Sequence, residues 1–80
     1  MEPEIVGDPF FIEVNKRQYS CLPMRANDRM LYKIKFNSSV LFVTKALNQH
    51  RIPFWTSIPQ DPKLRPIVSE LGRQIEKHFN

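Results

Sequence analysis

Residues 64–79, LRPIVSELGRQIEKHF, decide the fold of this chain. Their apolar side chains recur at three- and four-residue spacing, which places them in one stripe along an α-helix. The stripe consists of Leu64, Ile67, Val68, Leu71, Ile75 and Phe79. A helix with one apolar stripe needs an apolar surface to cover. We therefore expect the preceding residues to form a sheet that the helix covers.

The start of this helix is open between two alternatives. Asp61 followed by Pro62 is the pattern of an N-cap residue with proline at the first helical position. Pro66 would then lie one turn inside, where proline removes a backbone hydrogen bond. Either one turn spans residues 62–65 and the main helix begins near Pro66, or the helix is bent. Gly72 costs about 1 kcal/mol relative to Ala in a helix, and a close approach of helix to sheet would explain it.

A hairpin is predicted near the N-terminus. In Phe10–Val14 apolar residues alternate, and Asn15–Lys16 then suits a two-residue turn, because Asn tolerates positive φ. Lys at the second turn position is poorer than Gly. The turn predicts three facing pairs, which are Val14 with Arg17, Ile12 with Tyr19, and Phe10 with Cys21. The second strand is expected to end near Pro23.

Further strands follow a polar connection at residues 25–29. Met30–Phe36 alternates with period two, and residues 40–44 (VLFVT) are apolar throughout. A turn is expected at residues 37–39. Residues 45–53 form either a hairpin connection or a helical turn, and we favour the hairpin because Phe54–Thr56 resembles a short strand.

The order of elements predicts an α+β fold, an antiparallel four- to five-stranded meander with one C-terminal helix packed on one face. Residues 1–9 are expected to be a flexible acidic lead-in, and residues 10–80 a single α+β domain. The predicted core comprises Phe10, Ile12, Tyr19, Tyr32, Ile34, Phe36, one set from Val40 to Val43, Trp55, Leu64, Ile67, Val68, Leu71 and Ile75.

The charge of the chain is uneven. The net charge is +4, yet residues 1–13 carry four acidic and no basic residues, whereas residues 14–80 carry 12 basic and 4 acidic residues. A basic body can attract nucleic acid, anionic lipid or an acidic protein, although it is also an ordinary property of a solvated surface. One cysteine excludes an internal disulfide, and we expect a cytoplasmic protein. No apolar run is long enough to suggest a membrane span.

No combination of residues indicates catalysis. Cys21, His50 and His78 lack the spacing of a metal site, and nothing pairs Cys21 with either histidine. Two glycines in the whole chain leave no Gly-rich phosphate loop. We therefore expect no cofactor, no metal and no enzymatic activity, with Cys21 as a small core residue.

Binding is the remaining class of function. The predicted contact surface comprises Phe11, Arg25, Arg29, Lys33 and Lys35. One hypothesis is a module that binds a protein partner or itself, through an exposed apolar patch of Phe11, Leu31 and Leu22 or Met24 opposite the helix. The alternative is weak binding of single-stranded nucleic acid on the open basic face of the sheet.

The arrangement also resembles small uncharacterised bacterial single-domain proteins. The residues that carry the resemblance are FFIEVNKRQYSC at 10–21, Trp55 before a Pro-rich crossing, and PIVSELGRQIEKHF at 66–79. Such proteins are built as a β-meander with a C-terminal helix, and they tend to have Asn-Gly where this chain has Asn15–Lys16. The resemblance implies this fold and no activity.

Overall fold

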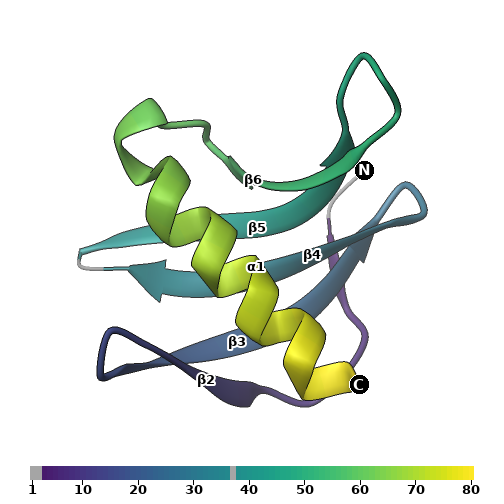
Figure 1. Ribbon diagram of the computed structural model, residues 1–80. Coiled ribbons are helices and arrows are strands. Elements are labelled where there is room, and N and C mark those ends of the chain that lie inside the picture. Colours follow the sequence, from purple (N-terminus) through teal and green to yellow (C-terminus); the bar gives the residue numbers. More distant parts are fainter. Residues whose placement is uncertain (1–2, 37) are drawn as a thin grey trace.

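An antiparallel sheet with a helix packed on one face makes up the fold, so the predicted α+β class is confirmed (Figure 1). The structure is a computed structural model, and it describes residues 3–36 and 38–80. Within these residues the elements are β1 (Glu4–Ile5), β2 (Phe10–Val14), β3 (Arg17–Ala26), β4 (Arg29–Phe36), β5 (Ser39–Leu47), β6 (Pro53–Ile58), the 3-10 turn η1 (Pro62–Leu64) and α1 (Arg65–Phe79). The strand order is β1-β3-β4-β5-β6, and β2 also pairs with β3.

The predicted first hairpin is correct in register and in turn type. β2 pairs with β3 through Phe10–Cys21, Ile12–Tyr19 and Val14–Arg17. Asn15 and Lys16 have φ of 52° and 64°, the two positive values that a type I′ turn requires. Asn27 and Asp28 repeat this conformation between β3 and β4, with φ of 51° and 62°. Asn15 and Asn27 therefore adopt a left-handed backbone conformation that few residue types tolerate.

β3 does not end near Pro23 as predicted, because it continues to Ala26. The backbone N–H of Val6 donates to the carbonyl of Pro23 at 3.1 Å, so the backbone groups of Pro23 face β1 rather than β4. The missing N–H of proline therefore removes no bond from the β3–β4 ladder.

The lead-in contains a strand that no sequence pattern shows. In β1, Ile5 pairs with Met24, and in β2, Phe10 pairs with Cys21, so residues 6–9 face two residues of β3. The two extra residues interrupt the ladder between β1 and β2 at this edge of the sheet. Two-residue strands such as β1 are too short to display any alternation, which explains why the sequence did not reveal it.

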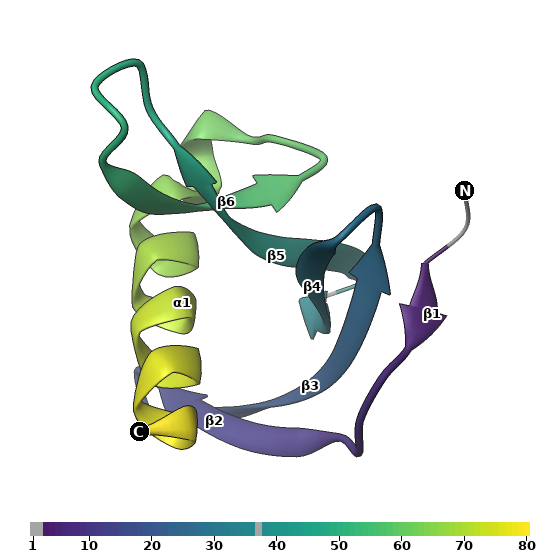
Figure 2. The ribbon, with the colours of Figure 1, turned by 90° about the vertical axis from the view of Figure 1, so that its right-hand side faces the viewer.

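The helix begins as in the first of the two alternatives. Asp61 caps η1, because its Oδ1 accepts from the Lys63 N–H at 3.0 Å, and α1 then starts at Arg65 with Pro66 in its first turn. There proline costs no intrahelical hydrogen bond. Figure 2 shows the sheet curving around α1, so that β2 and β6 both approach the helix.

The core lies between the helix and the concave side of the sheet, as predicted. Its buried members are Phe10, Ile12, Val14, Tyr19, Cys21, Ile34, Val43, Val68, Leu71 and Ile75. Tyr32, Phe36, Trp55, Leu64 and Ile67 pack around them and are partly buried. Phe79 ends the stripe with 58% of its surface exposed, although its ring lies 5.2 Å from that of Phe10.

Trp55 packs closely between the sheet and α1. Its indole ring lies directly against Gly72, so that a Cβ added at Gly72 would overlap Cγ, Cδ1 and Cδ2 of the indole. This is the close approach that the glycine predicted. Trp55 Nε1–H also donates to Glu76 Oε1 at 2.9 Å, and the same oxygen is 2.7 Å from Lys45 Nζ. The indole is therefore fixed on its face and at its nitrogen.

Residues 45–53 form a hairpin, as we favoured. β5 runs to Leu47 and β6 begins at Pro53. Asn48 holds the connection, because its Oδ1 accepts from the N–H groups of His50 and Ile52 at 2.8 and 3.0 Å. Of the turn expected at residues 37–39, Asn37 lies outside the described residues. In the part of the chain that the structure describes, no helix is long and apolar enough to cross a membrane.

Candidate functional site

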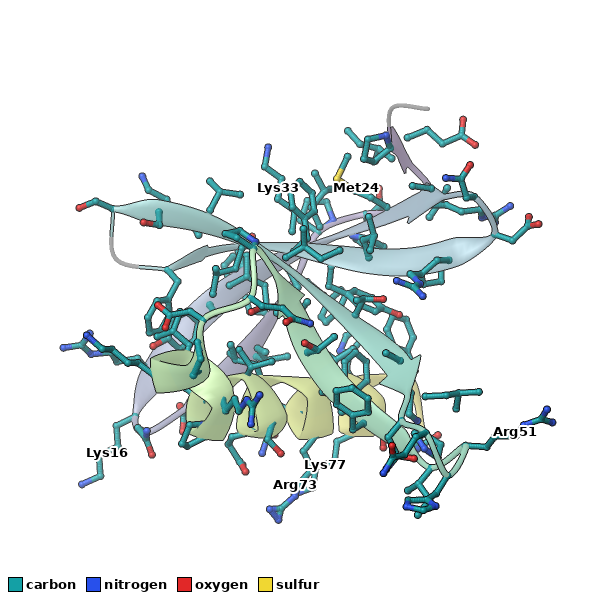
Figure 3. The ribbon with its side chains drawn as sticks, turned by 90° about the horizontal axis from the view of Figure 1, so that it is seen from above. Lys16, Met24, Lys33, Arg51, Arg73 and Lys77 are labelled. Carbon is teal, nitrogen blue, oxygen red and sulfur yellow. The ribbon has the colours of Figure 1, made fainter. Side chains whose placement is uncertain are left out.

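The candidate site is the side of the sheet that faces away from α1, which we call the outer face. Because side chains alternate along each strand, the register fixes its members. They include Ile5, Phe11, Leu22, Met24, Arg29, Leu31, Lys33, Lys35, Val40, Phe42, Thr44, Phe54 and Ile58. Figure 3 shows the side chains of Met24 and Lys33 pointing away from the helix, which carries Arg73 and Lys77 on its far side.

Four of the five predicted contact residues lie on this face. Phe11, Arg29, Lys33 and Lys35 belong to it, and all four are exposed, Phe11 to 65%. Arg25 does not, because it faces Met30 across the ladder and both lie on the helix side of the sheet. There Arg25 is opposite Glu4 of β1. The structure therefore places Arg25 on the opposite face of the sheet from the other four residues.

Apolar side chains flank Lys33 on both neighbouring strands. Leu22 lies opposite it on β3 and Phe42 opposite it on β5, and Ile58 on β6 follows Phe42 in the same row. Leu22 and Phe42 are half-buried, and Ile58 is 45% exposed. With Val40 and Met24 beside this row, we call Leu22, Met24, Val40, Phe42 and Ile58 the outer apolar patch.

The exposed apolar patch predicted around Leu31 is wrong in one member. Leu31 is only 6% exposed, although it lies on the outer face as expected. It lies in the row formed by Ile5, Met24, Leu31 and Thr44. Thr44 is fully buried, and its hydroxyl donates to the carbonyl of Met30 at 2.8 Å. Leu31 and Thr44, at the centre of this row, are buried. The accessible apolar surface lies in the neighbouring row, at Phe42 and Ile58.

Phe42 and Ile58 were missed because their strands carry a weak face signal. Residues 40–44 are apolar at nearly every position, so alternation could not decide whether Phe42 or Val43 faces the helix. The pairing of Phe42 with Lys33 would have settled it, because facing residues share one side of a sheet.

The outer face carries more positive than negative charge. Arg29, Lys33 and Lys35 lie on it, and Glu13 of β2 is the acidic residue that the register places there. Among the described residues, neither Lys33 nor Lys35 forms an ion pair, since the pairs found are Lys45–Glu76 and Arg73–Glu70. These lysines are therefore available to a partner.

Cys21 and the two histidines lie in different environments. Cys21 is fully buried, and burial raises the pKa of its thiol to about 12, so it is held as a neutral thiol. His78 stacks on Phe10 with 4.0 Å between ring centroids, whereas His50 lies in the exposed β5–β6 hairpin. Within residues 3–36 and 38–80, no cluster of three or more His, Cys, Asp or Glu residues could hold a metal ion.

Compared with known proteins, the chain matches no family model, no curated protein and no solved structure. The resemblance to small bacterial domains therefore rests on the pattern of elements alone.

Proposed function

We propose that this chain is a non-enzymatic protein-interaction module, and that its outer face binds a partner with an apolar centre and acidic groups around it. The observation that supports this most is the row Leu22–Lys33–Phe42–Ile58, which places a free lysine inside an uncovered apolar patch. A face of this composition differs from the strictly polar outer face that an isolated two-layer domain would carry.

The apolar side chains supply the driving force. Val40 and Ile58 are 44% and 45% exposed, and Phe42 lies between them on the surface. Contiguous exposed apolar side chains on a small domain usually mark a surface that a partner covers. Burying them in a complex would remove apolar area from water, which stabilises the complex at roughly 25 cal/mol per Å² before the costs of association.

The charges give the complex its selectivity. Lys33 and Lys35 have no partner among the described residues, so an apolar partner surface without carboxylates would leave Lys33 desolvated and unpaired. A partner with an acidic group opposite Lys33 avoids this cost. Such complementary charges also raise the association rate at low salt.

The test places a photo-crosslinking amino acid on the outer face in cells. Benzoyl-phenylalanine at position 58 should capture a protein that the same group at exposed Arg73, on the far side of α1, does not. The captured protein is then purified, and its Kd is measured for the wild-type chain, Lys33→Glu and the control Arg73→Glu. We expect Lys33→Glu to weaken binding at least tenfold, as expected for a residue central to an interface, and Arg73→Glu to leave it unchanged. Equal capture from both positions, or equal Kd values for both variants, contradicts the proposal.

Single-stranded nucleic acid is the second candidate, because Phe11 and Phe42 offer rings on the face that carries Lys33 and Lys35. An NMR titration with a mixed-sequence single-stranded oligonucleotide at low and at physiological salt separates the two candidates. Shifts around Phe11, Lys33 and Lys35 that weaken steeply with salt would favour nucleic acid. The absence of shifts at both salt concentrations would exclude it.

A further inference from the structure

We infer that the free edge of β6 is a second docking site, and that it binds an extended peptide segment as an added strand. This inference is independent of the proposed outer-face function, because it rests on backbone groups and a groove rather than on the outer apolar patch. β6 is the last strand of the sheet, and β5 occupies one of its two sides.

The register shows which backbone groups face the free edge. The N–H of Asn48 donates to the carbonyl of Ile52 at 3.1 Å, so these facing residues form a hydrogen-bonded pair. In an antiparallel ladder such pairs alternate with pairs that do not bond each other. Thr56 is therefore bonded to β5, whereas Trp55 and Ser57 direct their N–H and C=O groups away from it. Pro53, which has no N–H, lies in the same alternation as these two residues.

A groove runs along this edge. Its volume is about 660 Å³, and its lining residues come from β6, the β5–β6 hairpin, the crossing segment and the first turns of α1. Asn48 bounds it on the hairpin side, and Gln60 and Pro62 bound it on the side of η1. In Figure 1 the hairpin and η1 both extend beyond β6, at opposite ends of the strand. The free edge is therefore recessed between two projections.

The recess selects the occupant. A second copy that paired through its own β6 would have to bring the two strands to about 4.8 Å, and the hairpins and η1 turns of both copies would meet first. An isolated extended segment needs only the width of one strand. β6 has six residues, which corresponds to about 20 Å at 3.3 Å per residue. The occupant is thus an extended segment of about four to six residues.

The groove also defines the chemistry of that segment. On the helix side its wall contains buried Val68 and half-buried Trp55, which suit an apolar side chain. Arg65 lines the same wall and is exposed. The other charged lining residue, Asp61, already accepts a hydrogen bond from the Lys63 N–H at 3.0 Å. An acidic side chain on the segment could pair with Arg65. The segment therefore carries one apolar and one acidic residue on the side that faces α1.

The test uses a random heptapeptide phage library selected on the full chain. Selected peptides should combine apolar and acidic residues, and a synthetic peptide of the leading sequence should shift the amide signals of Trp55 and Ser57 in an NMR titration. Methylation of one peptide N–H at a time should weaken binding about tenfold at alternate positions and leave the intervening positions unchanged, because alternate groups alone bond the edge. Arg65→Glu should weaken binding severalfold, whereas the control Arg73→Glu should not.

Three results from the peptide experiments would overturn the inference. They are a selection that yields no binding peptide, shifts that cluster at Lys33 and Phe42 instead of β6, and a methylation series without alternation. Sedimentation of the free chain as a dimer that Ser57→Pro dissociates would also overturn it, because a second copy would then occupy the edge. Lys33→Glu serves as the separating variant, since it should weaken the outer-face partner and leave peptide binding intact.

Discussion

Replacing Gly72 by alanine tests the contact on which the packing of α1 depends. The new Cβ would overlap three atoms of the Trp55 indole ring. This ring is rigid, and it cannot move away freely because Nε1–H donates to Glu76 at 2.9 Å. The ring of Tyr32 also lies nearby, with its centroid 6.2 Å from that of Trp55. The strain therefore has to be relieved by a shift of the helix relative to the sheet.

Two effects of opposite sign decide the magnitude. Alanine is about 1 kcal/mol more favourable than glycine in a helix interior. Overpacking a well-packed core costs typically about 1–3 kcal/mol. Because the indole is fixed and the helix backbone is rigid, we expect a cost at the upper end of this range. The net expectation is a loss of about 2 kcal/mol in the free energy of unfolding, or a Tm lower by about 8–16 °C in a domain of this size.

The assay is thermal and guanidinium unfolding followed by far-UV circular dichroism, with Gly7→Ala as the matched control. A Cβ at Gly7 would meet Pro23 Cγ at 3.4 Å, an ordinary contact, so this variant should stay within about 0.5 kcal/mol of the wild type. In a Trp55→Ala background, which removes all three overlapped atoms, the cost of Gly72→Ala should fall by about 1 kcal/mol or more. A Gly72→Ala variant as stable as the wild type would refute the contact.

The remaining predictions concern a turn, a thiol and an ion pair. Lys16→Gly should raise the guanidinium midpoint by the equivalent of about 0.5–1 kcal/mol, because Lys16 holds φ at 64° and glycine relieves left-handed strain at some cost in chain entropy. The thiol of Cys21, with its pKa raised to about 12 by burial, should not react with Ellman's reagent at pH 8 until the chain unfolds. The hydrogen bond from Lys45, followed by that from Trp55, lowers the pKa of Glu76 below its usual 4.5. Its contribution to stability is therefore present above pH 4.5 and lost as the pH falls through the lowered pKa, so Glu76→Gln should reduce Tm at pH 7 and have no effect in strong acid.

Local patterns in the sequence were enough to predict most of the fold. Period-two alternation in residues 30–36 placed Tyr32, Ile34 and Phe36 on the helix side, where the structure has them. The positive φ of Asn15 and Lys16 follows from turn chemistry that involves neighbouring residues alone. Gly72 indicated a close approach, but its partner Trp55 is 17 positions away and no local pattern relates them.

The candidate site was harder to predict because it depends on registers between strands. Arg25 and Arg29 are close in sequence, yet the turn at Asn27 and Asp28 places them on opposite faces of the sheet. The burial of Leu31 depends on neighbours contributed by other strands, among them Thr44. Residues 40–44 of β5 are apolar at nearly every position, so their sequence does not show which face of the strand is exposed to solvent. Only the pairing of Phe42 with Lys33 shows it.

The two proposed surfaces share β6, and this leads to a further expectation. Phe54, Thr56 and Ile58 direct their side chains to the outer face, while the backbone of the same strand forms the recessed edge. A segment added at that edge extends the outer face by one strand directly beside Ile58. The selected peptide should therefore change the Kd of the outer-face partner, and the partner should change the peptide Kd by the same factor, because coupling between two binding equilibria is reciprocal. Titration of each ligand in the presence of the other measures both factors. Factors of one would show that the added strand stops short of the outer face.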